Sequence, residues 1–562
     1  MSQSKSWTDA IGRKSGRGKR NPPLWLIPKF ELGRLPCRGP RSRVSLCFSI
    51  NFYQLLTSVD KTKPKGGQVA MPIRAQEPSG SSATADVMKG ATGTAGPTAF
   101  PINRFAREIL TEIFWNCLPK VTDPAGWMSN SNAPLLLCRV CSLWRSIVLD
   151  APKLWTTVAI TIRNLKRDPR VGRQVINSWL ERSRNLPLGL YLIYEPMNFS
   201  RPKGTLLDTI LSVFYSHSSR WQRVFLHLPH GPPLSFPQLN APLLQSFRLL
   251  GTWDEDEGEP LPLPFSNSPH LKQLHSPFPI DVPANPHICW SQITDLRISS
   301  GMTFFTALEA IRLCPKLEKF DVDVATAAHN AGIDRVDDSR LPLNPVVESH
   351  SLRVLKFLVF DDCSPLLNSL TLPEMKDFTL EVFIMDEMGD NEPREMLLAE
   401  HQAFLGLLTR SGCQLDKLKL GHCAFNSPAI LECLEHKSLE TIQVLTIANL
   451  YNQRILKDDV LIGLTSRPLL PKLTHLTFEL CLAASPGTLG RMVHSRRFSW
   501  KEHGVEQLKS LTIVGKLKEE DTNLIHKAVS DGLYASIKEG DPDAYGPYDS
   551  DDANSDNDFD DF

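Results

Sequence analysis

The chain has 562 residues, of which 41% are hydrophobic and 22% are charged, and its 62 Lys and Arg residues balance its 62 Asp and Glu residues. This composition predicts a globular protein with a buried core, long enough for several domains or for one long repeat array. The balanced charge argues against a dedicated nucleic-acid or membrane-surface protein. Twelve scattered cysteines are typical of reduced thiols, which predicts a cytoplasmic or nuclear protein. No apolar run approaches the roughly 20 residues that a membrane helix needs.

Both ends of the chain have the composition of disordered segments. Residues 1–98 are rich in Lys, Arg, Gly, Ser and Pro, and the chain ends in "DSDDANSDNDFDDF", whose only charges are acidic. Such segments bury too little apolar surface to offset the entropy of ordering the chain. We therefore predict a disordered basic tail over 1–98 and a disordered acidic tail over 531–562. The basic cluster Arg13–Arg20 is interpreted as part of a solvated tail, with a nuclear-import signal as the alternative.

Residues 99–158 differ in character and contain two amphipathic helical patterns. The stretch "INRFAREILTEIFWNCLP" places apolar residues on one helical stripe, and Pro119 ends the predicted helix. The apolar positions of this first helix are Phe105, Ile109, Ile113 and Phe114, with Leu110 and Cys117 beside them. After a polar loop, "LCRVCSLWRSIV" predicts a second helix. Its apolar positions are Leu137, Val140, Cys141, Trp144, Ile147 and Val148.

Cys138 and Cys141 have the C-x-x-C spacing of redox and zinc sites. Cys141 lies inside the predicted apolar face of the second helix, and Cys138 lies at its edge. No second C-x-x-C and no nearby pair of histidines completes a zinc site, and no preceding strand indicates a thioredoxin-like site. We therefore interpret both sulfurs as small hydrophobic groups that pack in the core.

The two helical patterns resemble an F-box domain, in the form found in the large fungal set of F-box proteins. The matching residues are "REILTEIFWNCLP" and "PLLLCRVCSLWRSIVLDAPKLW", in which Val140-Cys141-x-x-Trp144 and Pro152-x-Leu154-Trp155 are the most specific parts. The resemblance implies a small helical module that docks on a Skp-type adaptor and, through it, on a cullin. About fifty residues cannot hide this many apolar side chains internally, so helices of a partner would cover the remainder.

The resemblance points to adaptor-binding candidates, some of which must belong to the core instead. These candidates are Phe105, Ile109, Leu110, Ile113, Leu135, Leu136, Val140 and Trp144. Among the apolar residues of the module, Trp144 and Trp155 are the expected core members. The family usually opens with Leu-Pro, where this chain has Phe105-Ala106, and the missing proline weakens the start of the helix. This departure leaves open an adaptor-independent interaction scaffold with a degenerate F-box.

From about residue 220 onward, an apolar triplet of the form L-x-x-L-x-L recurs. Complete copies begin at Trp221, Leu244, Ile293, Leu317, Leu352, Met375, Leu415, Ile442, Leu473 and Leu508, with an incomplete copy at Leu271 and Leu274. Successive copies lie roughly 22 to 40 residues apart, against the 20–29 residues of leucine-rich repeats. Each triplet predicts a short strand, and stacked copies predict a parallel sheet on the concave face of an irregular solenoid. Outer helices are expected in "FTALEAIRLCPKL", "REMLLAEHQAFLGLLTRSG" and "SPAILECLEHKSL".

The predicted fold class is therefore α/β, with an F-box at 99–158, a linking helix and strand region at 159–219 and a leucine-rich-repeat-like solenoid at 220–530. Box and repeats together imply a non-catalytic substrate-recognition subunit of an SCF-type (Skp–cullin–F-box) E3 ubiquitin ligase, acting in ubiquitin-dependent degradation. The protein substrate and its binding residues stay unknown, because the concave-face side chains are mixed in charge. Those side chains include Thr294, Asp295, Arg297, Glu318, Lys319, Asp321, Lys417 and Lys419.

Motifs of known chemistry are missing from the sequence. Without a phosphate-binding loop, a zinc-protease motif or a nucleophile elbow, we expect no cofactor, no metal and no catalysis, and neither a specific nucleic acid nor a membrane as partner. The nearest approach to a metal-binding set lacks finger spacing; it comprises Cys413, His422, Cys423, Cys433 and His436. The third alternative is an enzyme, for instance a thiol hydrolase, which would need one strongly activated cysteine.

Overall fold

The structure is a computed structural model, and its described residues belong to one compact unit, Thr98–Phe562. The described residues are 102–119, 128, 130–162, 169–194, 205–228, 236–251, 263, 265–277, 280, 287–324, 346–360, 362–382, 398–421, 425–449 and 455–538. The predicted basic tail and the predicted acidic tail from residue 539 onward lie outside this set. So do His422 and Cys423 of the candidate metal set.

The first part of the described chain is helical. It comprises η1 (Ile102–Arg104), α2 (Arg107–Trp115), η3 (Leu137–Arg139), α3 (Ser142–Asp150) and η4 (Pro152–Trp155). We call residues 102–155 the helical module. The helix predicted before Pro119 is α2. It buries Leu110 and Phe114, which are four residues apart and therefore lie on the same face of the helix.

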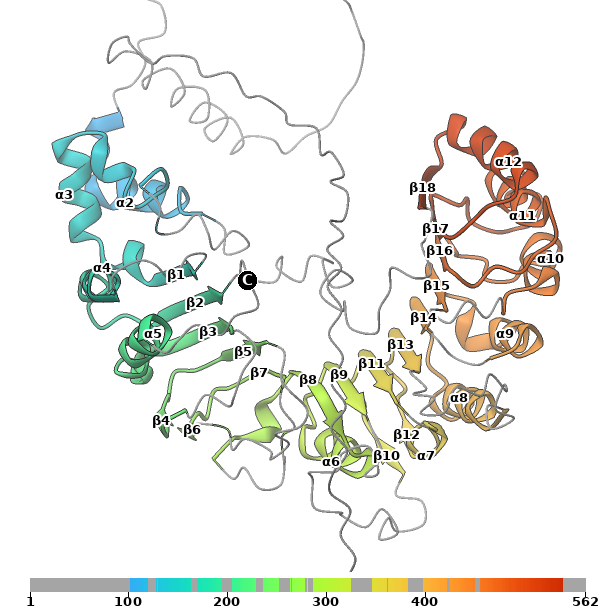
Figure 1. The fold of residues 1–562 in the computed structure, drawn as a ribbon, viewed down its shortest axis with the longest axis horizontal. Coiled ribbons are helices and arrows are strands. Elements are labelled where there is room, and N and C mark those ends of the chain that lie inside the picture. Colours follow the sequence, from blue (N-terminus) through green and yellow to red (C-terminus); the bar gives the residue numbers. More distant parts are fainter. Residues whose placement is uncertain are drawn as a thin grey trace, which may run out of the picture. The chain divides into compact units, whose positions relative to one another are not determined.

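Fourteen parallel strands form one continuous sheet, in the order β1-β2-β3-β5-β7-β8-β9-β11-β13-β14-β15-β16-β17-β18 (Figure 1). Their bounds are β1 (Thr157–Ile162), β2 (Leu188–Tyr194), β3 (Trp221–His227), β5 (Ser246–Leu250), β7 (Gln273–Ser276), β8 (Asp295–Met302), β9 (Lys319–Val324), β11 (Val354–Val359), β13 (Asp377–Val382), β14 (Lys417–Gly421), β15 (Val444–Ala448), β16 (His475–Glu479), β17 (Ser510–Val514) and β18 (Tyr534–Lys538). Two further parallel pairs join β4 (Leu239–Asn240) to β6 (Phe265–Asn267) and β10 (Val347–Glu348) to β12 (Leu370–Thr371). The predicted α/β class with a large parallel sheet is confirmed.

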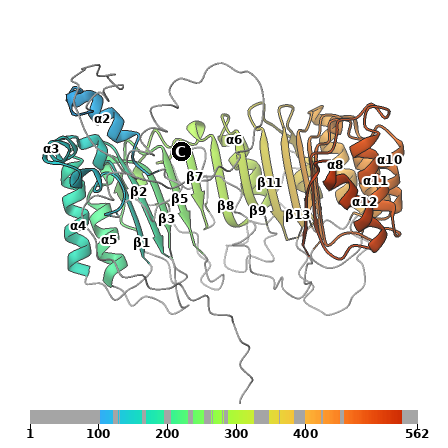
Figure 2. The same ribbon diagram turned by 90° about the horizontal axis from the view of Figure 1, so that it is seen from above.

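Helices connect the strands and cover one face of the sheet, as Figures 1 and 2 show. They are α4 (Pro169–Arg182), α5 (Thr205–Tyr215), α6 (Phe304–Leu313), α7 (Ser364–Asn368), α8 (Leu398–Ser411), α9 (Ser427–Leu434), α10 (Asp458–Ser466), α11 (Thr488–Phe498) and α12 (Glu519–Ser530), with 3-10 turns at η5 (Ser218–Arg220), η7 (Trp290–Gln292) and η10 (Lys437–Leu439). The expected outer helices correspond to α6, α8 and α9. We call the opposite face of the sheet the inner face.

The apolar triplets explain why the strands pair in register. In every copy, the second apolar residue is the Cα register partner of the same position in the next strand, beginning Val224↔Phe247 and Phe247↔Leu274. The same row ends at Leu476↔Leu511. The triplet residues are at most 4% exposed, because they point toward the helices, while alternate side chains point to the inner face.

The sheet is longer at both ends than the stretch 220–530 in which the triplets recur. It begins at β1, which spans the predicted boundary between the F-box and the linking region. Helix α4 and strand β2 are the helix and the strand predicted for the linking region. It ends at β18, which lies in the region predicted as acidic tail. These strands escaped the triplet search because β1, "TVAITI", and β18, "YASIK", lack the leucine spacing.

Two tryptophans join the helical module to the first strands. The Trp155 and Trp179 rings meet edge to face, with centroids 4.7 Å apart, and the Arg182 guanidinium lies 4.7 Å from the centre of the Trp155 ring. The indole N–H groups donate to the Val148 and Thr157 carbonyls, both at 2.8–2.9 Å. Because both indoles are buried and hydrogen-bonded, this junction fixes η4 against α4.

Candidate functional site

Helix α2 divides its apolar residues between the core and the solvent. Leu110 and Phe114 are buried, and the Phe114 ring packs on the Trp144 ring with centroids 4.8 Å apart. Ile109 is 50% exposed, and Phe105 and Trp115 are each 40% exposed. The helix therefore carries large apolar side chains that the described chain leaves in contact with water, at a cost of about 25 cal/mol per Å².

The prediction of one continuous helix for the second helical pattern is wrong. The chain forms η3, then turns at Val140 and Cys141, and starts α3 at Ser142. Cys141 adopts an extended conformation and caps α3, because its sulfur accepts a hydrogen bond from the Trp144 backbone N–H at 3.5 Å. The break turns Val140, 45% exposed, out of the predicted apolar face. Ile147 and Val148 stay buried as predicted.

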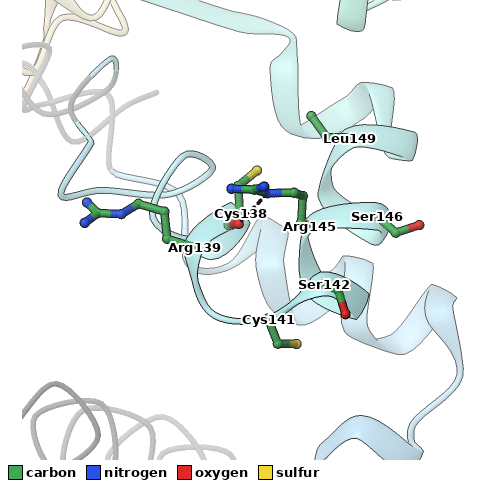
Figure 3. Close-up of a pocket in the computed structure, with 7 residues that line it drawn as sticks. All are labelled: Cys138, Arg139, Cys141, Ser142, Arg145, Ser146 and Leu149. Atoms are coloured by element: carbon green, nitrogen blue, oxygen red, sulfur yellow. Dashed lines mark hydrogen bonds between the residues drawn. The ribbon is translucent and has the colours of Figure 1, made fainter. Parts of the chain in front are cut away.

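The break also places both cysteines at the surface rather than in the core. Cys138 and Cys141 are half-buried free thiols that line a shallow pocket of about 450 Å³, together with Arg139, Ser142, Arg145, Ser146 and Leu149. Figure 3 shows the two sulfur atoms pointing apart, while Arg145 donates to the Cys138 carbonyl at 2.9 Å. Burial raises the pKa of Cys138 despite the nearby Arg145. The prediction that Cys138 and Cys141 pack in the core as small hydrophobic groups is thus wrong.

Polar contacts hold α2 against the end of α3 and against η4. Arg107 bonds the Asp150 carboxylate at 2.8 Å and the Ser146 hydroxyl at 3.2 Å, and Lys153 forms an ion pair with Glu112. The Lys153 ammonium also lies 5.6 Å from the centre of the Trp115 ring. Since all of these groups are exposed, the contacts orient the helices more than they stabilise them.

The structure sorts the adaptor-binding candidates into two groups. Leu110 and Trp144 are buried at 1% and 6% exposure, so they support the module from inside. The other six are exposed or half-buried: Phe105, Ile109, Ile113, Leu135, Leu136 and Val140. Sequence reasoning missed three exposed apolar residues of the same module, Trp115, Leu143 and Leu149. We call these nine residues the apolar surface of the helical module. The buried position expected for Trp144 and Trp155 is confirmed.

The inner face of the sheet begins with an apolar cluster. Ala159, Tyr191 and Phe225 occupy one row across β1, β2 and β3, and Leu118, three residues beyond α2, packs against them with Ile193 and Leu250. Burial raises the pKa of Tyr191. The chain itself therefore covers this part of the inner face.

Charged side chains replace the apolar cluster from β7 to β14. Several pair across neighbouring strands: His275 with Asp295 at 3.1 Å, Arg297 with Asp321 at 3.4 Å and Lys417 with Asp377 at 3.7 Å. The concave-face residues proposed from sequence lie here and are exposed or half-buried. A face of this kind suits a polar protein partner better than an apolar ligand.

The described members of the candidate metal set are Cys413, Cys433 and His436. Cys413 and Cys433 are buried, and burial raises their pKa to about 11 and about 12. His436 binds the Thr409 hydroxyl at 3.2 Å and accepts from the Ser438 backbone N–H at 3.2 Å. Within the described ranges, no three His, Cys, Asp or Glu residues come together as metal ligands.

No protein-family model matches the chain, and no curated protein matches it. Across the part of the chain that the structure describes, every helix is too short or too polar to cross a membrane.

Proposed function

We propose that the chain is a non-catalytic substrate-recognition subunit of an SCF-type E3 ubiquitin ligase, with an F-box in the helical module and an irregular leucine-rich-repeat solenoid behind it. One observation carries the proposal: the helical module leaves large apolar side chains exposed on α2 and at the turn before α3. Ile109, Phe105 and Val140 are each at least 40% exposed. A partner that covered these side chains would remove their apolar surface from water. The partner proposed to cover them is a Skp-type adaptor, and through it a cullin.

The parallel sheet supports the second half of the proposal. Its register repeats one apolar position from β3 to β17, as in stacked repeats that each bury their face against a neighbour. The polar inner face is the surface proposed to hold the protein substrate. We also propose that the protein acts in the cytoplasm or nucleus and that it has no catalytic activity of its own.

Co-purification with a Skp-type adaptor tests this function. We expect the full chain to retain the adaptor and the double variant Ile109→Asp, Ile113→Asp to lose it, because two carboxylates would have to be buried at the contact. The matched control is Val175→Asp with Leu186→Asp, since these residues are exposed apolar side chains outside the helical module. Adaptor retained by the first variant, or lost equally by both, would count against the proposal.

The second candidate is an adaptor-independent scaffold. Ala106 precedes α2 and offers no side-chain hydrogen bond to its first turn, so the start of the helix lacks both the family's proline and a polar cap. This candidate predicts no adaptor in the co-purification, while partners of the sheet are still recovered. Replacing Phe105-Ala106 by Leu-Pro would then restore adaptor binding if the degenerate start is the cause.

A further inference from the structure

We propose that the inner face of strands β9 to β16 binds a segment of a client protein that presents lysine or arginine side chains to Asp323, Glu381 and Glu479. This inference rests on the proposed function in treating the inner face as the client site, and it names the chemistry of the client. The charge pattern, the shape of the face and an unpaired carboxylate support it.

The charge pattern follows from strand register. Near the carboxyl ends of the strands, one row of inner-face side chains runs across six neighbours, and we call it the terminal row. It consists of Asp323, Leu358, Glu381, Gly421, Ala448 and Glu479. Across these six strands the row thus contains three carboxylates, and two strands further on it reaches Lys538 by way of Val514. From the preceding row, Lys419 pairs with Glu381, which leaves two carboxylates without an ion-pair partner among the described residues.

Gly421 and Ala448 create space between two of these acids. The Glu381 side chain lies over Gly421, where a Cβ atom would approach its Cγ to 2.8 Å. Gly421 and Ala448 lie on the two strands between Glu381 and Glu479, and their small size leaves room for the Glu381 side chain to extend toward Glu479. Burial raises the pKa of Glu479, although the charges of Lys419 and Lys538 lower it. The charge of Glu381 also raises this pKa, so the two carboxylates are near enough to repel each other.

Asp323 is the second acid of the terminal row that forms no ion pair with a described residue. It accepts no hydrogen bond from any described residue, and it is partly buried near Asp321, Arg297 and Glu381. Burial, followed by the charges of Asp321 and Glu381, raises its pKa to about 7, although the charge of Arg297 lowers it. A partly buried carboxylate close to another acid is more stable when it is paired or protonated, and a lysine or arginine of a client would pair it.

The geometry limits how the client lies. Neighbouring strands are about 4.8 Å apart, so the three acids are spaced by about 10 and about 14 Å across the sheet. An extended chain advances about 3.3 Å per residue, so such a client would place basic residues about three and about four positions apart. A nucleic acid is disfavoured, because its phosphates would meet this acidic row.

Fluorescence anisotropy with the full chain tests the proposal. The probe is a fluorescein-labelled Gly-Ser peptide with three arginines at those spacings, and its counterpart carries citrulline, which keeps the shape of arginine without the charge. We expect the arginine peptide to bind and the citrulline peptide to bind much more weakly. Glu381→Gln with Glu479→Gln should weaken binding about tenfold or more, as for lost charge-assisted hydrogen bonds. Lys419→Gln, which frees Glu381, should strengthen binding.

The control variant is Glu519→Gln with Glu520→Gln, which removes the same charge from the exposed start of α12. Equal weakening by the control would show that only general charge attraction holds the peptide, and this would overturn the proposal. So would no binding of the arginine peptide, equal binding of the citrulline peptide, or weaker binding by Lys419→Gln. Because the assay contains no adaptor, its failure leaves the co-purification result untouched, and the two proposals fail separately.

Discussion

Glu400 makes the stability of the chain depend on pH in a way that one substitution removes. Its side chain is 1% exposed at the start of α8, where one carboxylate oxygen accepts from the Cys363 backbone N–H at 3.4 Å and the other has no hydrogen-bond partner among the described residues. Burial, with help from the charge of Asp362, raises its pKa from 4.5 to about 7.

The sign and size of the effect follow from this pKa. The folded state holds the proton more tightly than the unfolded state, so stability is fully present below the unfolded value of 4.5 and falls as pH rises through about 7. Above that pH, the ionised carboxylate costs about 3 kcal/mol, since each pKa unit corresponds to about 1.4 kcal/mol. Glu400→Gln keeps an acceptor for Cys363 but cannot ionise.

Chemical denaturation of both proteins between pH 5 and pH 8 measures this difference. We expect the free energy of unfolding of Glu400→Gln to gain about 2 kcal/mol relative to the parent chain over that range, because other titrating groups cancel in the comparison. Glu435→Gln serves as the control, since Glu435 lies on the surface in an ion pair with Arg467. A difference between Glu400→Gln and the parent that is independent of pH would refute the reasoning.

Two further substitutions test packing inside the described chain. Trp144→Ala should cost about 3–5 kcal/mol of stability, because the buried indole packs on Phe114, and the loss should appear as early melting of the helical module in hydrogen exchange while the strands keep their protection. Unchanged exchange in α2 and α3 would mean that Trp144 is not core. Arg496→Met should cost about 2–4 kcal/mol, because the buried guanidinium donates to the Leu464 and Leu470 carbonyls at 2.9 and 3.0 Å and also to Leu469. Arg467→Met removes only an exposed ion pair and should change the melting midpoint little; equal effects of the two variants would contradict the account of Arg496.

The sheet could be predicted from sequence because its signal is repeated. A single triplet such as Leu415/Leu418/Leu420 is weak evidence for a strand, but ten copies with the same inward spacing specify both the strand direction and the register. The first two strands and β18 were not recognised as parts of the sheet, because "LGLYLIY" and "YASIK" follow no triplet. They join the sheet because its edges offer unpaired backbone groups, which is a property of the assembled fold.

The helical module shows where periodicity fails. The spacing of Leu137, Val140, Cys141 and Trp144 fits one helix, yet the chain breaks at Cys141, whose sulfur caps the next helix. Spacing also cannot separate core from contact residues, since Ile109 and Leu110 are adjacent on α2 and differ from 50% to 1% exposure. Which side of an amphipathic helix the chain itself covers depends on where Phe114 and Trp144 pack.

Hydrogen exchange of the full chain, with and without a purified Skp-type adaptor, tests the central claim most directly. The account predicts that the adaptor slows exchange in 105–115 and in 137–143 and leaves the strands of the sheet unchanged. No change in these two segments at saturating adaptor, or slowing confined to the sheet, would contradict an adaptor-docking role for the helical module.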